Sequence, residues 1–280
     1  MQPSKPQLLQ PDTIEVSTTV VSFTGREALS GTRAVPAEVA VNLVYGGIPF
    51  AVMMATPSDL EDFAIGFSLT EGIIKASSDI RGIRVEPEER GLRLSIDLTS
   101  ERLHEHLARK RALAGRTGCG LCGIGDLDSL PQAQMPPARA PSIAASAIHR
   151  ALARLEREQP LNDLTRCVHA AGWADLGGRL HQVREDVGRH NALDKLIGAL
   201  CSAGATPDDG FVLVTSRCSF ELVEKVAAFG ARTIVAISAP TSLAIERARH
   251  LDITLVGIAR HDTMTVFHGA ERICTQDAWP

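Results

Sequence analysis

Residues 210–258 read GFVLVTSRCSFELVEKVAAFGARTIVAISAPTSLAIERARHLDITLVGI, and this stretch decides the fold of the larger part of the chain. Three apolar runs of strand length alternate there with two segments of helical periodicity. The expected strands are Phe211–Thr215, Thr233–Ser238 and Ile253–Ile258, and the expected helices are 219–229 and 241–250. Continuous apolar strands separated by helices are typical of right-handed crossovers in a sheet with parallel strands, buried on both faces. The pattern predicts an α/β domain.

Polar side chains follow the expected strands, and in such a sheet ligands bind at the carboxyl ends of the strands. The residues concerned are Ser216, Arg217, Ser219, Ser238, Thr241, Ser242, Arg260 and Asp262. Segment 238–243 ends a strand and starts a helix, so its free N–H groups and hydroxyls suit an anion or phosphate. Simple helix capping is the alternative interpretation.

The rest of the chain extends this domain and predicts a smaller one before it. Residues 142–159 have an amphipathic helical pattern, two strand-like runs flank the turn Asp175–Gly178, and a helix is expected over 189–203. The predicted organisation is a loose arm with at most one short strand (1–35), an α+β domain (36–115), a cysteine loop with a proline-rich linker (116–141) and the α/β domain (142–280).

Within the α+β domain, the sequence predicts specific turns and caps. Tyr45-Gly46-Gly47 separates two β-rich runs, which predicts a hairpin with a Gly-Gly turn. Two overlapping capping boxes, Thr56 with Asp59 and Ser58 with Glu61, precede an apolar-periodic segment. They predict a helix that ends near Glu71.

Residues 116–125, RTGCGLCGIG, place two thiols among four glycines after a basic run. Glycine permits left-handed backbone and nearby positive charge favours thiolate over thiol, so we expect a reactive, adaptable loop. The spacing Cys119-x-x-Cys122 leaves a structural zinc site, a redox dithiol and sulfur transfer open. No tightly spaced second ligand pair supports zinc, and glycine inside and after the motif disfavours a thioredoxin-type site.

Residues 183–195, VREDVGRHNALDK, gather charged groups around one helix start. Asp186, His190 and Asp194 share a helix face if the helix begins by Asp186; otherwise Asp186 caps it. A salt-bridged surface helix is the alternative to a functional site.

Composition excludes some classes of protein. The net charge is −4 without a long charged block, which argues against nucleic-acid or membrane-surface binding. No apolar run approaches the length of a membrane helix, and the first residues lack the apolar core of a signal peptide. We expect a cytoplasmic protein that binds neither nucleic acid nor membrane.

The chain resembles the formate dehydrogenase accessory sulfurtransferase (FdhD/NarQ) family over roughly residues 38–268. The resemblance is carried by motifs in the family's order: TPSDLEDFAIGFSLTEGII (56–74), GCGLCG (118–123), REDVGRHNALDK (184–195), SRCSFELVEK (216–225) and SAPTSLA (238–244). It implies a cytidine-deaminase-like three-layer α/β domain joined to the smaller α+β domain. Where the family usually has Gly-Gly before its histidine, this chain has Arg166-Cys167-Val168-His169.

The same resemblance implies a function and a set of site residues. It implies a sulfurtransferase that takes sulfur from a cysteine desulfurase as a persulfide on Cys119, with Cys122 as second cysteine, and passes it to a molybdenum bis-guanine-dinucleotide cofactor for formate dehydrogenase. The implied cofactor-contacting residues are Ile258, Ala259, Arg260, His261, Asp262 and Thr263, with guanine-nucleotide contacts at His169, Arg184, Asp186, Arg217, Ser238 and Thr241. The cofactor would be bound as cargo, a guanine nucleotide could mimic part of it, and a homodimer is expected.

Two alternatives remain beside sulfur transfer. A zinc deaminase needs H-x-E followed by P-C-x-x-C, whereas His169-Ala170-Ala171 lacks the glutamate and the CxxC lies upstream. A non-catalytic cofactor-binding chaperone would use the cysteines only to shape a partner interface.

Overall fold

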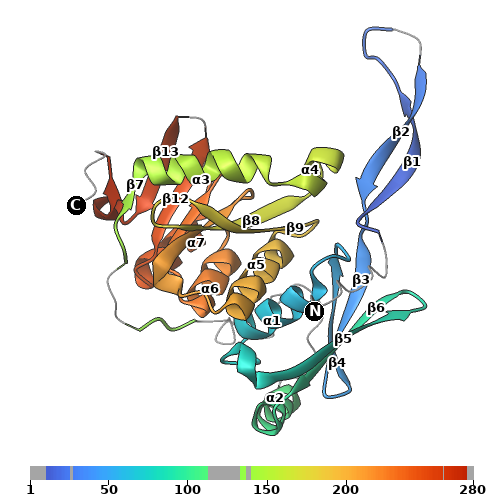
Figure 1. Ribbon diagram of the computed structural model, residues 1–280, viewed down its shortest axis with the longest axis vertical. Coiled ribbons are helices and arrows are strands. Elements are labelled where there is room, and N and C mark those ends of the chain that lie inside the picture. Colours follow the sequence, from blue (N-terminus) through green and yellow to red (C-terminus); the bar gives the residue numbers. More distant parts are fainter. Residues whose placement is uncertain (1–10, 26–27, 113–132, 137–139, 261, 276–280) are drawn as a thin grey trace, which may run out of the picture.

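A six-stranded mixed sheet forms the centre of the larger unit (Figure 1). The computed structural model describes residues 11–25, 28–112, 133–136, 140–260 and 262–275. The strand order is β13-β12-β11-β10-β8-β9, with β8 at His169–Asp175, β9 at Leu180–Asp186, β10 at Gly210–Val214, β11 at Thr233–Ala236, β12 at Thr254–Arg260 and β13 at Thr263–His268. The central strands β10, β11 and β12 are parallel, as predicted, and antiparallel strands extend the sheet on both sides.

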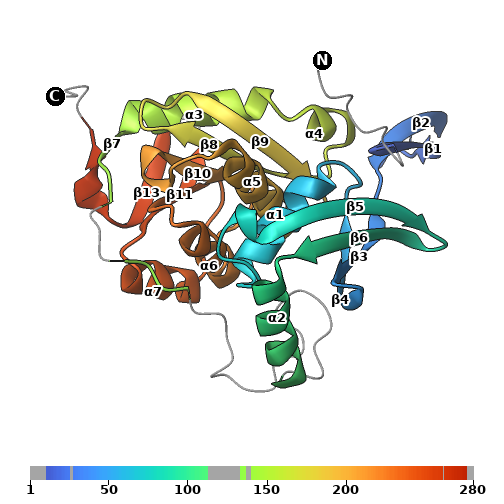
Figure 2. The same ribbon diagram turned by 60° about the horizontal axis from the view of Figure 1, so that its bottom comes forward.

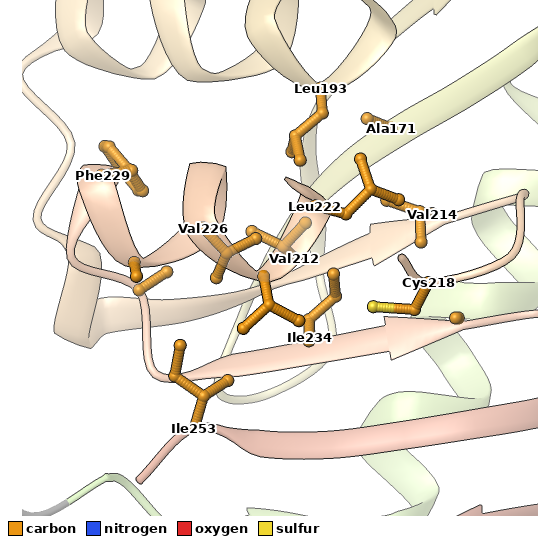
Figure 3. Packing of buried hydrophobic residues seen from close by; sticks show 14 of the residues in the cluster. Ala171, Leu193, Val212, Val214, Cys218, Leu222, Val226, Phe229, Ile234 and Ile253 are labelled. Carbon is orange, nitrogen blue, oxygen red and sulfur yellow. The ribbon is translucent and has the colours of Figure 1, made fainter. Parts of the chain in front are cut away.

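Helices cover both faces of this sheet, which gives the three layers implied by the resemblance. Helix α3 (Ala145–Arg157) packs with one face, whereas α5 (Arg189–Ala203), α6 (Phe220–Phe229) and α7 (Ser242–His250) pack with the other. Figure 3 shows Leu222 and Val226 of α6 packed between Leu193 of α5 and the strand residues Val212 and Ile234. The apolar runs of residues 210–258 therefore form the core because both faces of their strands are covered.

Short elements complete this unit. Helix α4 (Pro160–Thr165) follows α3, and β7 (Ile143–Ala144) pairs with β14 (Ile273–Cys274). Its single 3₁₀ turns are η3 (Pro207–Asp209) and η4 (Ala270–Arg272), whereas η1 (Ser77–Asp79) lies in the smaller unit. None of the helices in the described parts of the chain is long and apolar enough to cross a membrane.

The smaller unit is a four-stranded sheet with two helices, as the sequence predicts. The strands lie in the order β4-β3-β6-β5, with β3 at Val39–Tyr45, β4 at Ile48–Ala55, β5 at Ile80–Glu88 and β6 at Gly91–Leu98; α1 spans Leu60–Thr70 and α2 spans Ser100–Ala112. Gly46 and Gly47 have φ angles of 56° and 79°, so the turn between β3 and β4 needs left-handed backbone at both central positions. The predicted Gly-Gly hairpin is confirmed.

Residues 13–36 correct the expectation of an arm with at most one short strand. They form an antiparallel ribbon of β1 (Thr13–Val20) and β2 (Leu29–Pro36), which stands away from both sheets in Figure 1. One face of β1 carries Ile14, Val16, Thr18 and Val20, all β-branched, and β-branched side chains fit a pleated surface well. The prediction was wrong because it weighed the polar composition above this alternation.

The two units meet where α1 crosses α5 (Figure 2). A Cβ atom on Gly66 of α1 would lie 1.8 Å from the carbonyl oxygen of Asp194, and one on Gly198 of α5 would lie 1.9 Å from that of Asp62. Only glycine on both helices allows the two backbones to approach this closely. The crossing therefore fixes the smaller unit against the α/β unit.

The predicted capping boxes before α1 are wrong, although the helix itself is confirmed. Its N-cap is Asp59, with a φ of 53°, and the helix begins at Leu60. The Thr56 hydroxyl donates instead to Asp186 Oδ2 at 2.8 Å, across the contact between the two units. A long-range partner has replaced the local one.

Replacing Gly198 with alanine should destabilise the protein by about 3 kcal/mol, because the new methyl group forces the two helix backbones apart. Elsewhere inside a helix the same change stabilises by roughly 0.5–1 kcal/mol. Urea unfolding followed by circular dichroism measures the difference. Glu246→Ala, at an exposed position of α7 (Ser242–His250), is the control, and a Gly198→Ala protein at least as stable as the wild type would contradict the close crossing.

Candidate functional site

The candidate site lies at one edge of the six-stranded sheet, where three helices begin. Strand β9 runs in the same direction as β10 because both are antiparallel to β8, so α5 begins at the edge where α6 and α7 begin. The first N–H groups of a helix have no partner within the helix and carry partial positive charge. Three such helix starts along one edge favour an anionic ligand.

Most of the predicted contact residues lie along this edge. His169 opens β8, Arg217 follows β10, Ser238 follows β11, Thr241 is the N-cap of α7, and the end of β12 supplies Ile258, Ala259 and Arg260. Asp262 and Thr263 follow at the turn into β13, whereas His261 lies outside the described residues. Segments that are distant in the sequence are therefore brought together here, and ligand contact by each residue stays a prediction.

Asp186 is fully buried, and it accepts hydrogen bonds from both sides of the contact between the units. Its carboxylate lies 2.7 Å from the Lys195 ammonium and accepts from the Thr56 backbone N–H at 3.0 Å, the Gly188 N–H at 2.7 Å and the Asn191 amide at 3.0 Å. Helix α5 begins at Arg189 with Gly188 as its N-cap, so Asp186 neither shares its face nor caps it. That part of the sequence interpretation was wrong, because the Asp186 carboxylate forms an ion pair with the buried Lys195 ammonium.

Arg184 also faces the smaller unit. Its guanidinium lies 2.7 Å from an Asp62 carboxylate oxygen and 3.7 Å from Asp59, both at the start of α1. Burial raises the pKa of Asp62, and the hydrogen bond from Arg184 opposes this shift. Arg184 and Asp186 therefore join the two units beside the site.

Arg189 and His190, which are not among the contact residues that the resemblance implies, lie at the start of α5. Of the two, only His190 was singled out from the sequence, for its spacing from Asp186 and Asp194. Burial, then the charges of Arg189 and Lys225, lowers the pKa of His190 to about 4, against an opposing effect of Glu221. Burial and Arg189 also lower the pKa of His169. Both imidazoles are neutral at pH 7, so arginine supplies the positive charge. The sequence signal was Arg-His directly after Gly188, where a helix start presents side chains to the sheet edge.

Two buried nitrogen atoms at this helix start have no hydrogen-bond partner among the described residues: Arg189 Nε and His190 Nε2. The nearest acidic oxygen to His190 Nε2 is Oε2 of Glu221, 3.9 Å away. A buried polar group without a partner costs about 1–3 kcal/mol. A ligand with acceptor oxygens would satisfy the Arg189 N–H, and the neutral His190 imidazole can donate or accept at Nε2 according to its tautomer. They indicate a binding site more directly than charge does.

Ile258, at the end of β12, has a strained backbone. Its φ is 51°, and its side chain remains 43% exposed. A β-branched residue in left-handed conformation is a genuine outlier, costing on the order of 1–3 kcal/mol, and such strain clusters at functional sites. Its N–H donates to the Ser238 carbonyl, which ties the strained position to the end of β11.

The predicted thiols, Cys119 and Cys122, lie outside the described residues, so the zinc and dithiol alternatives stay open. Burial raises the pKa of Cys201 to about 11 and of Cys218 to about 12, which makes both poor nucleophiles at neutral pH. In the described part of the chain, no group of three or more His, Cys, Asp or Glu residues is placed to hold a metal ion.

Acid should destabilise the protein through His190. Its pKa is about 4 when folded and near 6.5 when unfolded, so its contribution is intact above pH 6.5 and is lost as the pH falls toward 4. Between pH 6.5 and 4, the free energy of unfolding of the His190→Gln variant should therefore fall by on the order of 2 kcal/mol less than that of the wild type. Urea unfolding between pH 4 and 7.5 measures it, with exposed His149→Gln as control. The raised pKa of Asp194, about 6, gives the opposite dependence of stability on pH. Because Asp194 is present in both the wild type and the variant, its effect cancels in the comparison. An unchanged pH dependence would refute the assignment.

Ile258→Gly should leave the free energy of unfolding unchanged or raise it by up to about 1 kcal/mol, since glycine adopts positive φ without strain. The exposed side chain should matter for binding instead, so affinity for guanine nucleotides should fall. Ile258→Ala, which keeps the Cβ atom, is the control. Isothermal titration with GDP and urea unfolding separate the two effects, and a marked loss of stability in the glycine variant would contradict backbone strain.

Comparison with known proteins agrees with the sequence resemblance. The model of the FdhD/NarQ family matches residues 36–274. Proteins named sulfur carrier protein FdhD are similar to this chain: that of Bordetella petrii is 44% identical over 236 residues, covering 84% of this chain and 85% of its own, and that of Cupriavidus necator is 47% identical, covering 84% and 82%. That of Xanthomonas axonopodis pv. citri is 47% identical over 241 residues, covering 85% of each chain.

A solved structure from Desulfotalea psychrophila, described as a formate dehydrogenase accessory protein, has the same fold. It superposes with a TM-score of 0.74 at 27% identity, over 94% of this chain and the whole of that one. The extent of the family match and the identity to these relatives decide the assignment: the chain belongs to the FdhD/NarQ family.

Proposed function

We propose that this protein is a sulfurtransferase that carries sulfur, as a persulfide on Cys119, from a cysteine desulfurase to a molybdenum bis-guanine-dinucleotide cofactor destined for formate dehydrogenase. Relatives named sulfur carrier proteins and a neighbour described as a formate dehydrogenase accessory protein support this assignment. The observation that carries it is a pair of buried nitrogen atoms, without a hydrogen-bond partner in the described part of the chain, at a sheet edge where three helices begin.

The groups at this edge fit an anionic dinucleotide. Arg189 offers a buried donor, Arg217 and Arg260 are exposed at the ends of β10 and β12, on either side of β11, and helix N-termini favour phosphate. Arg260 Nε donates to the Ile237 carbonyl at 2.9 Å, which leaves its terminal nitrogens for a ligand. Neutral His169 and His190 can hydrogen-bond a nucleotide without adding charge. The cofactor would be cargo, and a guanine nucleotide would occupy part of the same site.

Sulfur uptake is an exchange between a thiolate and a persulfide. The Cys119 thiolate attacks the terminal sulfur of the desulfurase persulfide, a new S–S bond forms on Cys119, and the old S–S bond breaks. The desulfurase cysteine leaves as a thiolate, so no external oxidant is needed. The basic run before the loop favours the thiolate form of Cys119.

Sulfur release uses the second cysteine. The Cys122 thiolate attacks Cys119 Sγ, a Cys119–Cys122 disulfide forms, and the terminal sulfur leaves as hydrosulfide. Over both steps the two cysteines lose two electrons and the transferred sulfur gains two. Hydrosulfide and one proton then replace an oxygen ligand of the cargo metal, which leaves as water. A cellular dithiol restores the cysteines.

The proposal includes partners and a setting. The cysteine desulfurase supplies the sulfur and formate dehydrogenase receives the cofactor. A homodimer would place two such edges in one assembly. Because both partners act where thiols stay reduced, we place the protein in the cytoplasm.

Mass spectrometry after incubation with a cysteine desulfurase and cysteine tests the persulfide. Wild-type protein should gain about 32 Da, one sulfur atom, on Cys119. Cys119→Ser should gain none, whereas Cys122→Ser should retain the adduct longer because its release step is blocked. Cys274→Ser, at an exposed cysteine of β14, is the control.

Formate dehydrogenase activation in cells completes the test. Cys119→Ser should abolish it, and Cys122→Ser should lower it at least ten-fold if release needs the disulfide. Full activation by Cys119→Ser, with GDP binding intact, would replace sulfur transfer with the chaperone alternative.

A further inference from the structure

A buried ion pair between α6 and α7 holds the backbone of Ala133, which follows Cys122 by eleven residues. The Ala133 N–H donates to Glu224 Oε2 at 2.6 Å, and Arg247 Nη2 donates to the Ala133 carbonyl at 2.7 Å. Arg247 Nε donates in turn to Glu224 Oε1. Both backbone polar groups of one residue are therefore bound by one ion pair.

Residues 133–136, which we call the strap, are held at further points although they form no helix or strand. The Pro136 carbonyl accepts from Arg232 Nη2, and the side chains of Ala133 and Met135 pack against the main core. In Figure 2 the strap is the short green segment beside α7. The sequence predicted a linker here, and this part of it is anchored.

Burial makes the ion pair an expensive way to add stability. The Glu224 and Arg247 side chains are only 6% and 10% exposed. Desolvating two such charges offsets most of their attraction, and well-packed apolar residues often serve as well or better. What apolar residues cannot do is bond the N–H and the carbonyl of a chain segment without secondary structure. Holding the strap is the role that the charges fill.

The strap also has a direction. Glu224 lies about one helical turn, or roughly 6 Å, from the start of α6. Helix α6 begins at the carboxyl edge of the sheet, which is the edge that holds the candidate site. Arg232 directly precedes β11, at the opposite edge of the sheet. Because Ala133 is bound by Glu224 and Pro136 by Arg232, the chain runs from the carboxyl edge toward the amino edge. Ala133, the end of the strap that is nearer to Cys122 in the sequence, therefore lies nearer to the candidate site than Pro136 does.

We propose that Glu224 and Arg247 are positioning residues for sulfur delivery, which fix Ala133, eleven residues after Cys122, next to the carboxyl edge of the sheet. This inference rests on the proposed function. Eleven residues bound the reach of Cys122 from Ala133 to about 40 Å. Without the ion pair, the next residue held by a side chain is Pro136, which Arg232 binds, and the tether grows from eleven to fourteen residues. Effective concentration falls roughly as the −3/2 power of tether length, which here means about 1.4-fold before any loss of direction.

The double variant Glu224→Leu/Arg247→Met tests the anchor without leaving a buried charge unpaired. Urea unfolding should show little loss of global stability, because apolar residues replace the pair. Hydrogen exchange should show that the Ala133 amide loses its protection. Val226→Ala, which opens a cavity on the same helix and leaves the ion pair in place, is the matched control and should keep that protection. Persistent protection in the double variant would refute the anchor.

Sulfur loading and delivery, measured separately, test the positioning role. Loading of Cys119 by the desulfurase should be unchanged, whereas formate dehydrogenase activation at equal protein level in cells should fall about 1.4-fold or more. In the Val226→Ala variant, activation should not fall relative to loading. Wild-type delivery by a double variant with an unprotected Ala133 amide, or an equal fall in loading and delivery, would overturn the inference. If wild-type protein takes up no sulfur, the proposed function fails, and the exchange experiment still decides whether the anchor exists.

Discussion

The structure depends on the contact between α1 and α5, where two helix backbones touch and a buried ion pair lies beside them. Gly66 and Gly198 permit the approach, and Asp186, Lys195 and Thr56 satisfy one another in its interior. Removing one partner of such a pair leaves an uncompensated buried charge, at a cost of roughly 3–5 kcal/mol. Since Asp186 ends β9 just before α5 begins, the same junction sets the position of Arg189 and His190 at the candidate site.

A second buried network extends this contact toward the site. Lys225 of α6 lies 2.9 Å from Asp194 of α5 and donates to the Thr70 hydroxyl of α1 at 3.0 Å. Its charge also helps to lower the pKa of His190. The groups that hold the units together therefore help to keep this imidazole neutral. A shift of α1 against α5 would change the electrostatics of the site as well as the packing.

The sequence predicts the parts of the fold that depend on local periodicity. The alternation in residues 210–258 and the Gly-Gly turn at Gly46 appear in the structure as expected. Thr56 shows where such reasoning ends: its spacing to Asp59 satisfies a local capping rule, yet its hydroxyl bonds to a residue 130 positions away. Likewise, the charge of Asp186 in the sequence does not reveal that Lys195 neutralises it. Arg189 was not selected from the sequence and His190 was noted only for its spacing, because burial, which gives both residues their significance, is a property of the packed molecule.

The charge at the candidate site suits what the proposed sulfur carrier would bring together there, the phosphates of a dinucleotide and hydrosulfide. Both are anions, and they repel each other unless fixed cations lie between or beside them. Arg189, Arg217 and Arg260 supply such cations, whereas lowered pKa values keep His169 and His190 neutral at pH 7. The positive charge of the edge is thus insensitive to pH around neutrality, and the imidazoles remain free to donate or accept one hydrogen bond each. A protonated imidazole would add attraction for phosphate, but it would lose the lone pair that can accept a proton from an arriving sulfur.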